Sequence, residues 1–306
     1  MHTAITIDAL KVLDAIDRKG SFAGAASELF RVPSAISYTV QKLEEDLDLQ
    51  VYDRSGHKAA LTPAGRYLLE EGRALLEAAE NLAHTTRQVA QGWETRLRIG
   101  FNSLIPAESL FPAIEDFYQL GVPVDVQIVE EVFAGAWDAL QSRRVDMIVG
   151  ADQLSKPAGA FTTKPLGAVP FVFAVAPHHS LASAREPLPD TEIARYPAAV
   201  AADTSRSLPP GNAGIFRRQR TLTVSNIDQK IAAQEAGLGV GWLPLPRVRE
   251  QLARGTLVAK EVEGARAPID VHLARHSDDK GKALMWFWER LGKDAELKNW
   301  LETNNP

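Results

Sequence analysis

The chain has 306 residues, of which 24% are charged and 45% are hydrophobic, and its formal net charge is −5. This composition excludes a disordered chain, the length predicts two or three domains, and the absence of Cys excludes disulfide bonds and thiolate metal sites. Residues 1–10 lack the basic and apolar stretches of a signal peptide, and no apolar run is long enough to span a bilayer, so we expect a cytoplasmic protein with no membrane partner. We also expect no metal and no cofactor.

Three short helices and a hairpin are predicted in residues 1–61. The first helix has apolar residues at helical spacing from Ile7 to Ile16 and ends at Gly20, because a cation in the last turn and a following Gly favour termination. Ser21 is a good N-cap for a second helix over 22–30. A third helix follows Pro33, and residues 50–61 have the pattern of a short hairpin. The apolar stripe of the third helix consists of Ile36, Val40, Leu43 and Leu47.

A long helix is predicted over residues 62–92, where no Pro after position 63 interrupts the chain. Leu68, Leu75, Leu82 and Val89 are spaced seven residues apart. Such a repeat is typical of helices that pair with another helix, so we expect these four residues to join two copies of the chain. The alternative is an amphipathic helix that packs on the core of its own chain.

From residue 93 onward, strand-like runs alternate with helical ones. Strands are expected over 97–101, 122–129 and 145–150, with intervening helices over 106–120 and 134–143. This order predicts a parallel sheet with helices on its faces. A second set follows over 171–262, while a strand over 269–274 and a helix over 282–301 can belong to either set. We therefore expect two α/β lobes.

The third helix has a polar face opposite its apolar stripe. Ser34, Ser37, Tyr38 and Gln41 share this face, and none of them is charged. Such hydrogen-bonding groups suit base edges and phosphate oxygens, so we expect the N-terminal half of the helix to enter a DNA major groove. The same pattern also fits a polar face in solvent. Cations that could hold the DNA backbone are Arg31 at the helix entrance and Arg54, His57 and Lys58 on the hairpin.

The charge of this region is low for a nucleic-acid-binding protein. Residues 1–92 contain 10 Lys and Arg against 13 Asp and Glu, and residues 18–66 contain 7 against 6. One copy would neutralise few phosphates, so we expect DNA binding to depend on dimerisation.

Several motifs resemble those of the LysR-type transcriptional regulators. Residues 20–26 (GSFAGAA), 32–37 (VPSAIS) and 41–45 (QKLEE) are similar to the family's winged helix-turn-helix, as are residues 52–54 and 61–65 beside the wing. Residues 144–149 and 236–244 resemble stretches of the family's effector lobes. A YhaJ-like branch is further suggested by residues 31–35, 37–39, 53–57, 92–95 and 134–137.

The resemblance implies an α/β fold with an N-terminal winged helix-turn-helix, a long linker helix and a two-lobed effector domain that resembles periplasmic binding proteins. The implied boundaries are 1–61 for the DNA-binding domain, 62–92 for the linker, 93–164 with 268–306 for the first lobe, and 165–267 for the second. The implied partners are double-stranded promoter DNA, a small organic effector, a second copy in a homodimer or homotetramer, and RNA polymerase. The DNA-binding residues would be Arg31, Ser34, Ser37, Tyr38, Gln41, Lys42, Arg54, His57 and Lys58.

The resemblance also places an effector site between the lobes, at strand ends where helices begin. The matching positions are Asn102, Ser103, Val132, Phe133, Asp203, Thr204, Ser205, Ser225 and Asn226. Because Val132 and Phe133 are apolar where the family often has Gly, Ser or Thr, we expect an effector with an aromatic or apolar body. The helix starts at this site can also hold an anion such as a carboxylate.

Two other functions fit parts of the chain. One is a two-lobed enzyme with a dimerisation head, but no nucleophile, base and orienting group share a recognisable spacing. The other is a solute-binding protein for a transporter, which the missing signal peptide and the N-terminal helices disfavour. We therefore expect a transcriptional regulator, not an enzyme, in which effector binding changes the arrangement of the lobes and hence promoter binding or bending.

Overall fold

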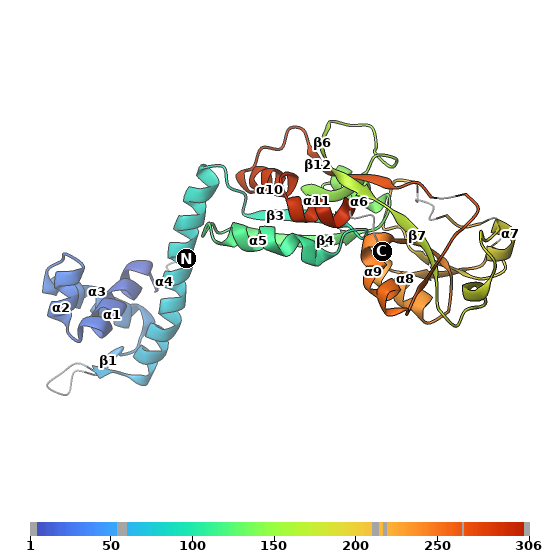
Figure 1. The fold of residues 1–306 in the computed structure, drawn as a ribbon. Helices are drawn as coiled ribbons and strands as arrows, with labels where there is room; N and C mark the ends of the chain where they lie inside the picture. Colours follow the sequence, from blue (N-terminus) through green and yellow to red (C-terminus); the bar gives the residue numbers. More distant parts are fainter. Residues whose placement is uncertain (1–4, 54–59, 210–213, 217–218, 265, 303–306) are drawn as a thin grey trace. The chain divides into compact units, whose positions relative to one another are not determined.

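The computed structural model describes residues 5–53, 60–209, 214–216, 219–264 and 266–302. The chain forms two compact units, residues 1–90 and 91–306, each shown in Figure 1. Among the described residues, no helix combines the length and the apolar character that a membrane crossing needs.

The first unit begins with the three predicted short helices. They are α1 (Ile7–Lys19), α2 (Phe22–Glu28) and α3 (Pro33–Leu47). Gly20 ends α1 in the left-handed conformation, and the Ser21 side chain caps α2 by accepting a hydrogen bond from the backbone N–H of Gly24. Both helix boundaries are therefore confirmed. Ile36, Val40 and Leu43 of α3 are buried in the core that these helices share.

A short hairpin follows α3. Strands β1 (Tyr52–Asp53) and β2 (Ala60–Leu61) pair antiparallel, and the segment between them lies outside the described residues. The Glu44 carboxylate accepts hydrogen bonds from the backbone N–H groups of Val51 and Tyr52 at 2.8 and 3.0 Å. This acidic residue of α3 therefore fixes the start of the wing.

The linker helix α4 (Pro63–Ala90) packs on α1 at its N-terminal half. Gly72 allows the close approach, because a Cβ there would lie 2.7 Å from Leu10 Cδ2. Arg73 adds ion pairs to Asp14 and Asp17 at 2.7 and 2.8 Å. Helix α4 is thus held firmly to the other helices of its unit.

The first lobe of the second unit is built on a five-stranded sheet in the order β4-β3-β5-β12-β6. Its strands are β3 (Arg96–Asn102), β4 (Asp125–Glu131), β5 (Met147–Asp152), β6 (Phe161–Val169) and β12 (Ile269–His276). The expected parallel pairing is found for β3, β4 and β5, but β12 runs antiparallel to both β5 and β6, so the sheet is mixed. Its helices are η1 (Ala107–Leu110), α5 (Phe111–Tyr118), α6 (Gly135–Gln141), α10 (Lys282–Gly292) and α11 (Ala295–Glu302).

The second lobe contains two smaller sheets. One has the order β10-β7-β11 and the other pairs β8 with β9. Its strands are β7 (Phe171–Val175), β8 (Ala198–Ala201), β9 (Thr221–Val224), β10 (Gly241–Pro244) and β11 (Val258–Lys260). Its helices are η2 (Ser180–Ser183), α7 (Asp190–Ile193), α8 (Ile227–Glu235) and α9 (Leu245–Arg254).

Strand β6 was not predicted, because Pro165 and Lys164 interrupt its apolar pattern. Pro lacks a backbone N–H and is tolerated at the edge of a sheet or at a bulge, and β6 is the edge strand with a register shift beside Pro165. The strand continues to Val169, past the expected lobe boundary at 164. In this sheet the chain therefore passes to the second lobe after Val169.

The single helix expected over 282–301 is two helices. Helix α10 ends at Gly292, and the buried Asp294 carboxylate accepts a hydrogen bond from the Leu297 backbone N–H at 2.9 Å. A carboxylate in this position caps the start of α11, so the local hydrogen bond ends one helix and begins another.

Candidate DNA-binding and effector-binding sites

The polar face of α3 is exposed as predicted. Ser34, Ser37, Tyr38 and Gln41 all lie on the solvent side, opposite the buried stripe. The N-cap of the helix is Val32, which offers no side-chain cap, and the first turn contains no acidic residue. No side chain caps α3, but Pro33 has no N–H and the Ala35 N–H bonds to the Val32 carbonyl at 3.0 Å, so the positive end of the helix dipole is the feature that suits an anion such as phosphate.

The charged residues beside this face are partly engaged. Arg31 forms a two-pronged ion pair with Asp8 at 2.6 and 2.9 Å, and this hydrogen-bonded pair lowers the pKa of Asp8. Gln41 donates to Glu45 at 2.9 Å, and Lys42 lies 3.8 Å from Asp46. Arg54, His57 and Lys58 lie outside the described residues. The face is thus nearly neutral where the structure describes it.

The predicted dimerisation stripe of α4 is exposed at three of its four residues, and its role in pairing stays a prediction. Leu75, Leu82 and Val89 of α4 are exposed, with 69% of Leu82 accessible, whereas Leu68 packs against the core of its own unit. Three of the four residues are therefore apolar side chains that are largely exposed to solvent in the single chain.

Two predicted effector residues, Asp203 and Thr204, bind the first lobe instead of facing a cavity, and Ser205 bonds to Asp203 and to the Leu208 carbonyl within its own segment. The Asp203 carboxylate accepts hydrogen bonds from the backbone N–H groups of Ala134 and Gly135, at 3.3 and 3.1 Å, and from the N–H of Ser205 at 2.7 Å. Thr204 Oγ1 accepts from the Val132 N–H at 2.9 Å and donates to the buried Glu131 carboxylate. These side chains therefore join the second lobe to the start of α6.

The buried carboxylate of Asp138 on α6 makes the reciprocal connection. It accepts hydrogen bonds from the backbone N–H groups of Arg206, Ser207 and Leu208, and from the Arg144 guanidinium at 2.9 Å. Burial acts to raise the pKa of Asp138, but the bonds from Ser207 and Arg144 outweigh it and lower that pKa to about 2. We call the groups of Glu131, Asp138, Asp203 and Thr204 the interlobe latch. Sequence reasoning missed it because each partner lies on the other lobe, about 70 residues away.

A cavity of about 200 Å³ lies between the lobes beside this latch. Three predicted residues line it, namely Asn102, Ser103 and Phe133. Of the other predicted residues, Val132 is buried in a hydrophobic core, and Asn226 caps α8 by accepting from the Gln229 N–H at 3.0 Å. Ser225 donates its backbone N–H to Gln229 and does not line the cavity.

The remaining walls of this cavity are mainly apolar, with one cation and one carboxylate. They are Leu104, Asp152, Leu154, Ser155, Phe171, Ile227, Arg266 and Ile269. The Arg266 guanidinium lies over the Phe171 ring at 4.2 Å from its centroid, and it has no hydrogen-bond acceptor among the described residues. The Asp152 carboxylate accepts from the Ser155 N–H at 2.7 Å. An unpaired guanidinium on an aromatic wall is a site for an anion with an apolar body. Sequence reasoning missed Arg266, because no motif marks it.

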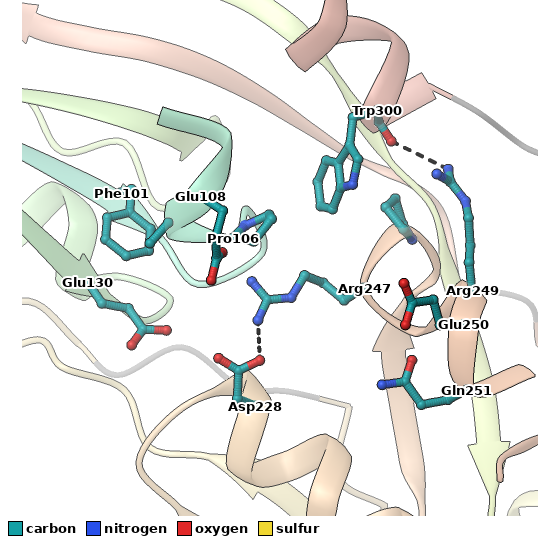
Figure 2. A pocket seen from close by; sticks show the side chains of 12 residues that line it. Phe101, Pro106, Glu108, Glu130, Asp228, Arg247, Arg249, Glu250, Gln251 and Trp300 are labelled. Atoms are coloured by element: carbon teal, nitrogen blue, oxygen red, sulfur yellow. Dashed lines mark hydrogen bonds and ion pairs between the residues drawn. The ribbon is translucent and has the colours of Figure 1, made fainter. Parts of the chain in front are cut away.

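A second groove between the lobes is polar and more open (Figure 2). Arg247 projects into it and pairs with Asp228, and its side chain is only 9% exposed. Arg249 donates to the backbone oxygen of Trp300 at 3.4 Å. The cations of this groove already have acceptors, so the cavity of about 200 Å³ is the better candidate for an effector site.

The chain matches two family models. The description "Bacterial regulatory helix-turn-helix protein, lysR family" matches residues 7–66, and "LysR substrate binding domain" matches residues 90–296. The chain is 41% identical to the "Probable HTH-type transcriptional regulator YhaJ" of Escherichia coli strain K12 over 292 residues, which cover 95% of this chain and 97% of that protein. It is 34% identical to the regulator PunR of the same strain, over 95% of this chain and 94% of that protein.

Solved structures show the same fold. An OxyR mutant from Corynebacterium glutamicum has a TM-score of 0.59 at 19% identity, covering 96% of this chain and 92% of that chain. CrgA, a LysR-type transcriptional regulator from Neisseria meningitidis, has a TM-score of 0.51 at 20% identity, covering 96% of this chain and 99% of that chain.

Proposed function

The chain belongs to the LysR-type transcriptional regulators, which bind DNA and carry an effector domain, and we propose that it reads promoter DNA with the N-terminal half of α3. The observation that carries this proposal is the exposed, uncharged face of α3 at a helix start that lacks a side-chain cap. Hydroxyl and amide groups there can bond base edges, and the positive end of the helix dipole favours a phosphate. At the acidic C-terminal end of α3, the Glu44 carboxylate accepts a hydrogen bond from the Val51 N–H at the start of the wing.

A gel-shift with the DNA upstream of the chain's own gene tests this assignment. We expect the combined Ser34→Ala, Ser37→Ala and Gln41→Ala variant to bind at least about tenfold more weakly, because each base contact contributes roughly 1–3 kcal/mol. These side chains are exposed, so the fold stays intact. Gln91→Ala, at an exposed site outside the first unit, is the control and should bind as the wild type does. Unchanged affinity of the triple variant at the same salt concentration would contradict the assignment.

The effector proposed for the interlobe cavity is a small organic anion, such as a carboxylate on an aromatic or apolar body. Arg266 would receive the carboxylate, and Phe133 and Phe171 would cover the body. Asn102 and Ser103 would supply hydrogen bonds from the end of β3. The predicted residues Asp203 and Thr204 would act indirectly, because they hold the lobes together, and Ser205 would support Asp203 through its backbone N–H.

The exposed stripe of α4 supports a homodimer, and the family's usual assembly supports a tetramer formed from two such dimers. Two copies present two α3 helices to DNA. This doubles the DNA contacts, which matters because the first unit has few cations. Effector binding would change the lobe arrangement and hence promoter binding, bending or contact with RNA polymerase in the cytoplasm.

A further inference from the structure

The turn between α2 and α3 contains a residue in a conformation that its type disfavours. Phe30 has a φ of 54°, in the left-handed region. The N–H of Arg31 bonds to the carbonyl of Ala26 at 2.9 Å, which is the hydrogen bond of a helix C-terminal motif whose left-handed position is usually occupied by Gly. A bulky side chain at this position strains the backbone, so the turn alone favours a smaller residue.

The core of the unit does not require Phe30 either. The side chain is 96% exposed, whereas the preceding Leu29 packs against the core. A fully exposed aromatic ring on a strained backbone contributes nothing to folding among the described contacts. Both observations indicate that the ring serves a surface that another molecule covers.

The position of the turn identifies this molecule. Phe30 lies two residues before the Val32 N-cap of α3, and Val32 is also exposed. The two apolar side chains therefore adjoin the end of α3 that, under the proposed function, enters the major groove. The surface proposed for a second copy of the chain is elsewhere, on the exposed stripe of α4.

We infer that Phe30 is a DNA contact, and that its ring packs on the C5-methyl groups of thymines at the edge of the groove. The thymine methyl is the apolar group of the major groove, and Phe is one of the side chains that reads it. The contact needs no charge, so it can add to DNA binding by a unit that has few cations. It extends the readout of α3 to bases beside those that its hydrogen-bonding face contacts, and it rests on the proposed orientation of α3.

The test uses two versions of one DNA fragment, amplified from the region upstream of the chain's own gene with either dTTP or dUTP. With primers that carry deoxyuridine in place of thymidine, the dUTP product lacks every thymine methyl but keeps all hydrogen-bonding groups. We expect the wild-type chain to bind the dUTP product about tenfold more weakly than the dTTP product. Phe30→Gly should bind both products with the same reduced affinity, and its melting temperature should be equal to or above that of the wild type because the strain is relieved.

Two further variants complete the test. Phe30→Leu keeps an apolar side chain and should retain part of the preference for the dTTP product. Leu238→Ala removes another exposed apolar side chain, in the second lobe, and should leave DNA binding unchanged.

Equal binding of the two products by the wild type, or wild-type discrimination by Phe30→Gly, would overturn the inference. A shift of Phe30→Gly toward a smaller assembly in sedimentation would also overturn it, because the ring would then serve a protein contact. If Phe30→Gly binds normally while the α3 triple variant does not, only the Phe30 contact fails. If neither variant loses affinity, the proposed function of α3 fails as well.

Discussion

Arg266 and Lys230 place two positive charges in the second lobe with few partners. Lys230 is 3% exposed, and its ammonium donates to the Trp242 backbone oxygen at 2.7 Å. Burial and, to a smaller extent, the charge of Arg266 lower the pKa of Lys230 to about 7. Burial also lowers the pKa of Arg266. An anion at Arg266 would offset this unfavourable charge, which gives the site a physical reason to bind one.

Lys230 makes the stability of the second unit depend on pH. The pKa of about 7 in the folded chain is below the value of about 10.5 that an unfolded Lys has. Between these two values the unfolded chain holds the extra proton, so the free energy of unfolding should rise as the pH increases from 7 to 9, by up to about 1.4 kcal/mol per unit. Urea unfolding followed by Trp fluorescence measures it, because all six Trp residues lie beyond residue 92.

The variant Lys230→Met is the comparison for this prediction. It removes the titrating group while keeping a side chain of similar length, so the pH-dependent rise should become smaller. An equal rise in the variant would show that another group causes it.

Residue-level prediction from the sequence succeeded where the chemistry is local. The uncharged face of α3 and the caps at Gly20 and Ser21 depend on neighbours within a few residues. Asn102, Ser103 and Phe133 were placed by their position at strand ends, and they do line the cavity. Asp203 and Thr204 could not be assigned, because their partners belong to the other lobe. The place of Arg266 in the cavity could not be predicted either, because it depends on the Phe171 ring, which is distant in the sequence.

At the scale of elements, α4 was predicted from local sequence, whereas β6 depends on a strand that is distant in the sequence. The seven-residue repeat of α4 is a property of one continuous helix and was visible in the sequence. Strand β6 depends on its neighbour β12, whose antiparallel pairing accommodates Pro165 at the sheet edge. The division of the last helix depends on the hydrogen bond that Asp294 makes to Leu297.

The exposed stripe of α4 leads to a prediction about assembly. A chain with both Leu75→Glu and Leu82→Glu should sediment as a smaller species than the wild type, because charges would be buried without partners in the paired helices. Its DNA affinity should fall with the loss of the second head. Ala83→Glu, which adds one such charge on a different face of α4, should keep the wild-type assembly. Identical sedimentation of the double variant and the wild type would contradict the pairing of α4.

For the whole molecule, the acidic net charge no longer argues against DNA binding. The proposed reading face is neutral, and the acidic residues of α3 are used at the wing, in Glu44, or paired along the helix, in Glu45 and Asp46. Affinity should then depend more on assembly than on salt. In the second unit, the interlobe latch bonds the backbone on both sides of Phe133, which lines the cavity, so we expect a ligand against Phe133 to affect the latch.

The coupling between cavity and DNA is tested most directly by fluorescence anisotropy of the labelled upstream DNA. The wild type and Arg266→Gln are titrated onto it with each member of a panel of aromatic carboxylates, starting with benzoate, and with the matching uncharged amides. A carboxylate should shift the DNA titration of the wild type by about fivefold or more, its amide should not, and Arg266→Gln should respond to neither. The same response in Arg266→Gln as in the wild type, or amides that act as strongly as the acids, would contradict the proposed effector site.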